Sequence, residues 1–479
     1  MSGISSVLNI GRNALRTYEL AMQVTSHNVA NALTPGYTRQ QIVLESQRPM
    51  NLAGLQLGMG VKAGAVGQAF DQYTTRSIQQ TASSLAENEA KATALSYLET
   101  IFNEAAGQGL NQAMADFWNA WQDLANNPGG VSERTALLQK AEALATQFNS
   151  MSENLNQVRQ SMNTNLKASI LELNQTAAQI ASLNEKIVAS ESDGTTANDL
   201  RDQRNNFVEK MSSLIGINYY EDNNGSLTIT TTSGNLLVDG IQSWELSQVG
   251  EQIYWDGIPT NLSAGLAGGK IGGWLEIRDE IVPQYLANLD ELAGSLIQEL
   301  NALHSSGYAQ SGATGLNFFE PLINPIPGDF SGAAASIGLS SDLSGDPANI
   351  AAGGLSGASG DNENALRILD LQTNNAIQIR KWTYAERGTN ISSILQTTTL
   401  EDYYESLVGD MGILTSGVNQ SRDFAQTLID RLGEVRDSVS GVNLDEEMTE
   451  LIKIQRAYEA SAKLISITDE MLQALLQIR

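Results

Sequence analysis

The chain has 479 residues, enough for several domains of about 100–200 residues each. Its 54 acidic and 28 basic residues give a formal net charge of −26, so surfaces that bind nucleic-acid phosphates or anionic lipid are disfavoured. Cysteine is absent and there are only 2 histidines, which excludes disulfides, thiolate zinc sites and thiol nucleophiles. No apolar run approaches the roughly 20 residues that cross a bilayer, and we expect neither a nucleic-acid nor a membrane partner.

The first predicted element is a long amphipathic helix over residues 4–32. Apolar or small residues recur at steps of three and four, the spacing of a heptad repeat, and they are Ile4, Leu8, Gly11, Leu15, Tyr18, Met22, Thr25, Val29 and Ala32. The helix is predicted to end at Thr34-Pro35-Gly36, because proline has no amide to donate and glycine allows the chain to reverse. Residues 40–67 lack a helical period and are predicted to be extended or looped.

A helical region follows the extended segment. Composition and period predict helices at about 71–106, 110–126, 131–190 and 197–214. Between residues 217 and 257 the pattern changes to short β-prone runs separated by turns such as Asp222-Asn223-Asn224-Gly225, which predicts a small antiparallel β insertion. Later helices are predicted at about 274–304, 362–385 and 399–438, with a loop-rich Gly, Ser, Pro and Ala stretch at 305–360.

The chain closes with a second heptad stripe. Its members are Leu451, Ile454, Tyr458, Ser461, Ile465, Thr468, Leu472 and Leu475. A narrow apolar stripe at each end of the chain needs a partner helix, which is the other terminus, a neighbouring subunit or both. The predicted fold is mainly α with a β insertion: terminal coiled-coil helices, a long helical-bundle rod domain and a small antiparallel β outer domain.

No catalytic set emerges from the sequence. His27 is interpreted as a helix-surface or interface residue, and the Asp445-Glu446-Glu447 run as carboxylates that complement a helix dipole, with Asn443 as the cap. An acid/base pair or a hard-metal site at these carboxylates is the less favoured alternative. We therefore expect no enzymatic activity, no cofactor and no metal site.

Both ends of the chain resemble a known family. Residues 26–39, Ser-His-Asn-Val-Ala-Asn-Ala-Leu-Thr-Pro-Gly-Tyr-Thr-Arg, look like the N-terminal signature of the axial proteins of the bacterial flagellum. The positions of this motif are Asn28, Ala30, Asn31, Thr34, Pro35, Gly36, Tyr37 and Arg39. Residues 440–447, Ser-Gly-Val-Asn-Leu-Asp-Glu-Glu, and the following Gln455-Arg456-Ala457-Tyr458 are similar to the C-terminus of the hook-associated protein 1 family, the first junction protein between hook and filament. Residues 199–204 also resemble an internal helix of that family.

The resemblance implies a structural subunit of the flagellum at the hook–filament junction, exported through the flagellar type III apparatus and required for filament assembly. It implies an inner-core assembly domain at 1–70 and 440–479, mobile in the monomer, and a helical bundle at 71–216, 272–306 and 361–439. A β outer domain at 217–271 and a loop-rich segment at 307–360 complete the chain.

The implied assembly residues lie on the two terminal helices. On the first they are Ile4, Leu8, Leu15, Tyr18, Met22 and Val29. On the last they are Gly441, Val442, Asn443, Leu444, Glu446, Leu451, Ile454, Tyr458, Ile465, Leu472 and Leu475. The implied partners are copies of the chain itself, the hook protein, the next hook-associated protein, and an export chaperone at the C-terminal helix.

The sequence also departs from the family. Gln68 stands where members often have an arginine, which puts the charge contact of that arginine in doubt. Two alternatives remain: the hook protein or another axial subunit, and a secreted adhesin or enzyme with its active part in the central insertion.

Overall fold

The computed structural model describes residues 2–52, 55–102, 109–256, 258, 260–322, 328–343 and 345–477. It divides into two compact units, each assembled from distant segments of the chain. Unit 1 contains residues 1–84, 171–246 and 424–479. Unit 2 contains residues 85–170 and 247–423.

The chain is mainly helical with small antiparallel sheets, which confirms the predicted fold class. The helices are α1 (Ser2–Asn31), α2 (Gln72–Ile101), α3 (Leu110–Asn126), α4 (Val131–Glu191), α5 (Asn198–Leu214), α6 (Gly269–Glu276), α7 (Val282–Ser306), α8 (Ala333–Ser336), α9 (Glu363–Thr373), α10 (Leu400–Ser440) and α11 (Leu444–Gln477). A π-helical turn (Ile277–Ile281) joins α6 to α7, and short 3-10 turns lie at Ser263–Gly265, Ser341–Leu343 and Pro347–Asn349.

The strands form short antiparallel sheets. They are β1 (Gln40–Ser46), β2 (Met50–Leu52), β3 (Leu55–Leu57), β4 (Val61–Gln68), β5 (Ile217–Glu221), β6 (Leu227–Thr231), β7 (Leu236–Asp239), β8 (Gln242–Ser243), β9 (Leu246–Val249), β10 (Gln252–Trp255), β11 (Ile377–Ala385) and β12 (Asn390–Thr398). β5 to β8 form one four-stranded sheet in chain order, and the other strands pair as β1–β4, β2–β3, β9–β10 and β11–β12.

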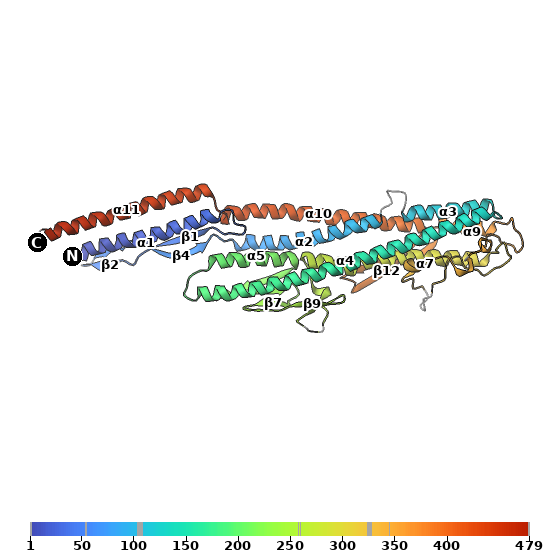
Figure 1. The fold of residues 1–479 in the computed structure, drawn as a ribbon, viewed down its shortest axis with the longest axis horizontal. Helices are drawn as coiled ribbons and strands as arrows, with labels where there is room; N and C mark the ends of the chain where they lie inside the picture. The colour runs from blue at the N-terminus through green and yellow to red at the C-terminus, as the bar shows by residue number, and fades with distance from the viewer. Residues whose placement is uncertain are drawn as a thin grey trace. The chain divides into compact units, whose positions relative to one another are not determined.

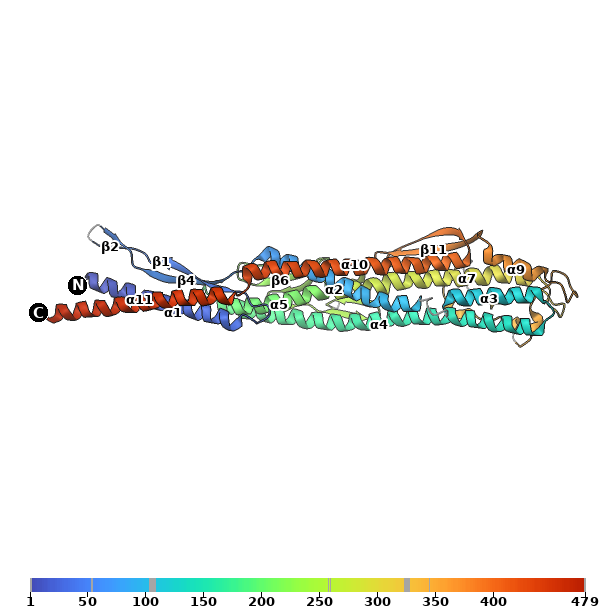
Figure 2. The ribbon, with the colours of Figure 1, turned by 90° about the horizontal axis from the view of Figure 1, so that it is seen from above.

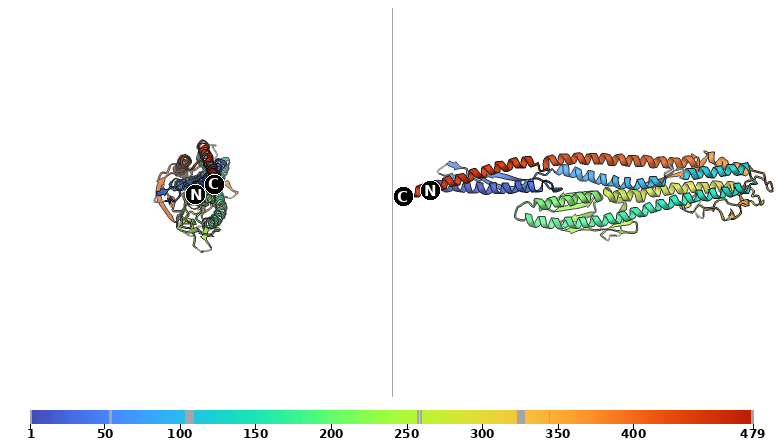
Figure 3. Two further views of the ribbon diagram at one scale, coloured as in Figure 1. Left: turned by 90° about the vertical axis from the view of Figure 1, so that its left-hand side faces the viewer. Right: turned by 45° about the horizontal axis from the view of Figure 1, so that its top comes forward.

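In unit 1 the two terminal helices lie side by side. α1 and α11 run antiparallel along their length, and the β1–β4 ribbon lies against α1 (Figures 1 and 2). The two ends of the chain therefore lie at the same end of unit 1 (Figure 3). The ribbon pairs Gln40 with Gln68 and Ser46 with Val61, and a bulge interrupts its register between Ile42 and Leu44.

The same unit contains the sheet β5–β8, held by the last turns of α4 and by α5. Asn184 of α4 is fully buried and donates from Nδ2 to the carbonyls of Leu227 and Gly240. Arg204 of α5 donates to Asn184 Oδ1 and, at 2.7 Å, to the Glu221 carboxylate. These buried polar contacts fix α5 against the sheet, because each buried polar group needs a partner.

Unit 2 is built around one apolar core drawn from α3, α7, α9, β11 and parts of α2, α4 and α10. Phe117 and Trp121 of α3 pack against Phe318 with ring centroids 5.9 and 5.3 Å apart. Phe318 and Phe319 are fully buried although they belong to the segment predicted as loop-rich. This segment therefore has few regular elements but contributes aromatic side chains to the core.

One predicted helix of unit 2 is wrong in its second half. The helix expected over 362–385 ends at Thr373, and residues 377–398 form the β11–β12 hairpin. Ile377 and Ile379 of β11 are buried with a period of two, the spacing of a strand. The inner edge of β11 is paired with side chains of α7: Asn288 Oδ1 accepts from the Trp382 amide at 2.7 Å. This tertiary contact outweighs the local helical preference.

Within the described ranges, no helix is both long enough and apolar enough to span a membrane.

Candidate functional site

The packing of α1 on α11 depends on small residues. The buried positions of α1 follow steps of three and four and are Gly11, Ala14, Thr17, Ala21, Thr25 and Asn28. At Gly11 the helices approach so closely that an added Cβ would lie 2.7 Å from Cγ1 of Ile465. Small side chains thus allow the two helices close approach.

The large apolar residues predicted on α1 do not form this buried row. Ile4, Leu8, Leu15, Tyr18, Met22 and Val29 are all half-buried. Apart from Gly11 and Thr25, the buried row lies about one residue before the predicted stripe. Most members of the predicted stripe are large apolar side chains, whereas small side chains make the closest contact between the helices. The larger side chains flank the contact and keep part of their surface exposed.

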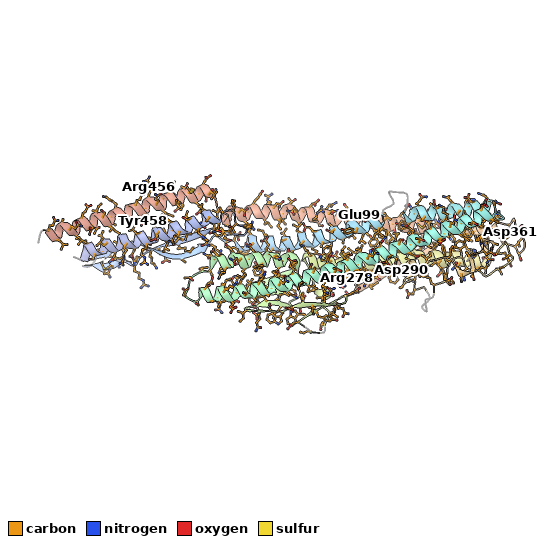
Figure 4. The ribbon with its side chains drawn as sticks, viewed as in Figure 1. Glu99, Arg278, Asp290, Asp361, Arg456 and Tyr458 are labelled. Carbon is orange, nitrogen blue, oxygen red and sulfur yellow. The ribbon has the colours of Figure 1, made fainter. Side chains whose placement is uncertain are left out.

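On α11 the predicted stripe faces α1. Ile454 is buried, and Leu451, Tyr458, Ile465 and Leu472 are half-buried. Tyr458 lies on the side of α11 toward α1, whereas Arg456, whose side chain is 79% exposed, points away (Figure 4). The side chain of Leu475 lies outside the described residues.

The N-terminal motif is organised around Asn28. Its side chain is 1% exposed, and its Nδ2 donates to the Gln40 carbonyl at 2.9 Å and to Glu447 Oε2 at 3.0 Å. Its Oδ1 accepts from the Gln40 amide at 2.9 Å and from the Tyr37 hydroxyl at 2.8 Å. One amide side chain therefore joins the end of α1, the start of β1 and the first turn of α11.

Arg39 makes the second link between the termini. Its Nε donates to Glu447 Oε1 at 2.7 Å, and its Nη1 donates to Glu446 Oε2 at 3.2 Å. The Arg39 amide also donates to the Ser440 carbonyl at the end of α10. Glu447 is buried and has both carboxylate oxygens paired, as a buried charge requires.

The α5 helix supplies the third side of this arrangement. Asp202 Oδ2 accepts from the Thr38 amide at 2.9 Å, and Asp199 Oδ1 accepts from Gln40 Nε2 at 2.7 Å. His27 Nε2 lies 3.3 Å from Asp199 Oδ1, and its ring packs edge-on against the Tyr37 ring. We call these contacts of Asn28, Tyr37, Thr38, Arg39, Gln40, Asp199, Asp202 and Glu447 the motif network.

Burial affects the protonation of two members of the network. Burial raises the pKa of the Tyr37 hydroxyl above its ordinary value. The negative charges of the nearby Asp199, Asp202 and Glu447 carboxylates raise it further. Tyr37 therefore stays a hydrogen-bond donor to Asn28. Burial also raises the pKa of Asp202, opposed by the hydrogen bonds that Asp202 accepts from Thr38 and Gln68.

Gln68, at the position where the resemblance implied an arginine, makes a neutral contact. Its Nε2 donates to Asp202 Oδ1 at 2.9 Å and to the Asn198 carbonyl at 3.0 Å. The amide keeps a hydrogen bond to this carboxylate but adds no positive charge beside it. This uncompensated charge is consistent with the raised pKa of Asp202.

The loop after α1 depends on backbone geometry. Gly36 has φ +73°, and an added Cβ there would overlap the Asn206 side chain. Asn31 Nδ2 donates to the His27 carbonyl and Asn31 Oδ1 accepts from the Thr34 hydroxyl. Ala30, Thr34 and Pro35 are exposed, so this part of the motif shapes the turn without being buried.

At the C-terminal motif, Asn443 begins α11 as predicted for a cap. Its Oδ1 accepts from the Asp445 amide at 3.0 Å. Gly441 and Val442 are half-buried, and Leu444 is 48% exposed. The acidic run that follows also has a role that dipole reasoning missed, because Glu447 is the buried partner of Asn28 and Arg39.

The network brings together the three segments that resembled the flagellar family, 26–39, 199–204 and 440–447. The sequence pattern identified Asp199 and Asp202 only as part of a helix that resembles the family. It predicted no role for Gln40. Within the described ranges, no three or more His, Asp or Glu side chains are grouped as a metal site would need. The arrangement joins these three segments through hydrogen bonds and one ion pair.

Comparison with known proteins also finds flagellar proteins, in agreement with the resemblance of the three segments that the network joins. A family profile described as the flagellar hook-associated protein FlgK helical domain matches residues 95–319. A second, described as the flagellar basal body rod FlgEFG protein C-terminal region, matches residues 437–478. Flagellar hook-associated protein 1 of Bacillus subtilis is 29% identical, over 98% of this chain and 97% of that protein. Over nearly its whole length the chain is similar to flagellar hook-associated protein 1.

Two further comparisons give the same result. Hook-associated protein 1 of Escherichia coli is 24% identical over 99% of this chain and 100% of that protein. The structure of the flagellar hook junction protein FlgK from Burkholderia pseudomallei matches with a TM-score of 0.64 and 18% identity, and it covers 76% of this chain and 100% of that chain. That similarity shows a shared fold. Members of this family are structural proteins of the flagellum.

Proposed function

We propose that the chain is a structural subunit of the junction between flagellar hook and filament, and that filament assembly requires it. The observation that supports this most strongly is the motif network, which joins both ends of the chain through the residues that resemble the family. Arg39 and Glu447 link the loop after α1 directly to the first turn of α11, so the two terminal helices are held as one unit.

The proposed partners follow from the same role. They are further copies of the chain, the hook protein below, the next hook-associated protein above, and an export chaperone on α11. The chaperone proposal is supported by the apolar side chains that α11 leaves exposed, since an amphipathic helix fits an apolar groove. The location proposed for the assembled chain is extracellular, after export through the flagellar type III apparatus.

We also propose that the terminal pair, residues 1–70 and 440–479, is mobile before assembly. Small side chains form most of its buried row on α1, so the pair buries little apolar surface. A helix with a weakly buried face is only marginally stable in water. Docking into the growing structure would then complete the burial.

Two competing functions are less well supported. The hook protein or another axial subunit would also carry the terminal motif, but the relatives that match over nearly the whole chain are hook-associated protein 1. A secreted adhesin or enzyme would need a reactive site in the central insertion. The histidine of that region, His304, is fully buried, and both of its ring nitrogens form hydrogen bonds with the backbone of Leu316 and Ala351.

Deleting the gene tests the proposed function. We expect cells with hooks but without filaments, and flagellin released into the medium. Normal filaments on the deletion strain would contradict the proposal. Loss of the hooks themselves would favour the hook-protein alternative instead.

A further inference from the structure

The β11–β12 hairpin of unit 2 has one edge covered by α7. Side chains of α7 accept hydrogen bonds from the amides of three alternate β11 residues. These amides belong to Arg380, Trp382 and Tyr384, and their acceptors are Glu291, Asn288 and Gln284, at 3.2, 2.7 and 3.0 Å. The carbonyls of Arg380 and Trp382 point the same way, since they accept from Tyr403 and Asn288. At these positions the β11 backbone therefore points away from β12.

The strand register extends this alternation to β12. Leu395, Ser393 and Ile391 lie opposite Arg380, Trp382 and Tyr384. In an antiparallel pair, a residue whose backbone groups point away from the neighbouring strand lies opposite one that does the same. The backbone groups of Ile391, Ser393, Leu395 and, by the same alternation, Thr397 thus point to the outer side of β12, which we call the open edge. No hydrogen bond among the described residues pairs these outward groups.

The open edge has no protection against pairing with another strand. Residues 390–395 are all exposed, and Ile394 and Leu395 are 61% and 63% exposed. β12 contains no charged residue and no proline, and its register with β11 runs without a bulge. Native proteins commonly use these features to prevent open edges from pairing. Figure 2 shows the hairpin along the outside of the helices, where a further strand can reach it.

The strand that fits this edge best is β12 of a second copy. The chain has a net charge of −26, so copies repel one another over most of their surface, whereas β12 contributes no charge. A two-fold axis at Ile394 makes hydrogen-bonded pairs of Ile391 with Thr397 and of Ser393 with Leu395. Ile394 then lies directly opposite Ile394 of the other copy, at the distance of a cross-strand contact. This register pairs the outward backbone groups and covers the most exposed isoleucine of the strand.

We propose that two copies of the free chain join edge to edge through β12, so that their two hairpins form one continuous antiparallel sheet. The contact uses the same surface on both copies and closes with two of them, whereas an axial structure needs contacts that repeat without closing. It does not depend on the proposed function. Because a strand-edge interface is small, we expect a reversible dimer with a dissociation constant of about 10–100 µM.

Analytical ultracentrifugation of the full chain over about 1–200 µM tests the dimer. Leu395→Pro removes an amide at the open edge and none that bonds to β11, so it should weaken the dimer at least about tenfold while the hairpin remains folded. Ser393→Lys keeps every backbone group, and it should weaken the dimer similarly because it places like charges close together. Thr383→Lys is the control, since it puts the same charge on β11, and its dissociation constant should stay within about twofold of wild type.

A chain that is monomeric at every concentration would overturn the inference. So would a dimer that both Leu395→Pro and Ser393→Lys leave unchanged, or one that Thr383→Lys weakens as much as Ser393→Lys does. If the chain stays monomeric and the deletion strain still lacks filaments, this inference alone fails.

Cysteine cross-linking tests the register without background, because the chain has no native cysteine. Ile394→Cys should form a covalent dimer on mild oxidation, since the two thiols lie directly opposite each other in a non-hydrogen-bonded pair. Ser392→Cys is the control, because in this register it lies opposite Gln396 and should remain monomeric under denaturing conditions. No cross-link from Ile394→Cys, or equal cross-linking of both variants, would overturn the inference.

Discussion

Arg39 and Glu447, which lie 408 positions apart in the sequence, form a 2.7 Å ion pair in which the carboxylate is buried. The pair fixes the loop after α1 to the first turn of α11. Asn28 binds the other oxygen of the same carboxylate. Glu447 is therefore the buried side chain through which both Asn28 and Arg39 hold the C-terminal helix.

Removing Arg39 should loosen the terminal pair. Arg39→Ala leaves the buried Glu447 carboxylate without its cation, which we expect to lower the free energy of opening the pair by about 1–3 kcal/mol. Limited proteolysis of the purified chain should then trim the termini about tenfold faster, because cleavage follows the population of the open form.

Arg456→Ala is the matched control, since that side chain is 79% exposed and pairs only at the surface with Glu459. Its trimming rate should stay within about twofold of wild type. Equal rates for the Arg39 and Arg456 variants would show that the motif network does not hold the termini.

Gly36→Ala should destabilise the turn that precedes β1. The backbone has φ +73°, which alanine adopts only with strain, and the added methyl group would displace the exposed Asn206 side chain. We expect a loss of about 1–2 kcal/mol in unfolding free energy, measured by thermal or denaturant unfolding. Gly58→Ala is the control, because nothing lies within 4 Å of its added Cβ. A similar effect at both positions would contradict this explanation.

The buried His304 should make unit 2 sensitive to acid. Burial lowers the pKa of His304 from 6.5 to about 4. Nε2 accepts from the Ala351 amide and so cannot be protonated without losing that bond, while Nδ1 donates to the Leu316 carbonyl. The stability that the neutral ring supplies is complete above pH 6.5 and is lost as pH falls toward 4, a change of about 3 kcal/mol.

The measurement compares wild type with His304→Gln at pH 7 and pH 4.5. The difference in unfolding free energy between the two proteins should shrink at the lower pH. The contributions of other titrating groups are the same in both proteins and cancel in this difference. One such group is Asp290 (Figure 4), because burial raises its pKa to about 6 and its protonation on acidification favours the folded state. A difference that is independent of pH would contradict the role of His304.

Asn288→Leu should detach the β11–β12 hairpin from α7. Asn288 is 1% exposed, and its side chain pairs with both the amide and the carbonyl of Trp382 and accepts from the Tyr403 hydroxyl. Leaving these buried groups unpaired should cost about 2–4 kcal/mol. Hydrogen exchange at the Trp382 amide is the readout, and unchanged protection there would contradict the prediction.

Features that depend on neighbouring residues in the chain could be predicted from the sequence. Period and breakers located the long helices and the turns of the β insertion, and Asn443 was recognised as a cap from its position before an acidic run. These features depend on neighbours in the chain. The β11–β12 hairpin was not predicted. The backbone groups at its inner edge form hydrogen bonds with side chains of α7, which lie about a hundred residues away in the sequence.

The candidate site was predicted in part. The motif named Asn28, Tyr37 and Arg39 by resemblance, but Glu447, the shared partner of Asn28 and Arg39, carried only the weak signal of an acidic first turn. The buried row of α1 was missed because side-chain size does not say which face lies closest to a neighbour. Gly11 was the available signal, since glycine within a long helix often marks close packing.

The most direct test of the account uses the chain without its last helix. A version lacking residues 444–479 is expressed in the deletion strain, and cells are imaged by electron microscopy. The account predicts a folded, soluble protein and bare hooks without filaments. Filaments in normal number would contradict the claim that the joined termini are the assembly site.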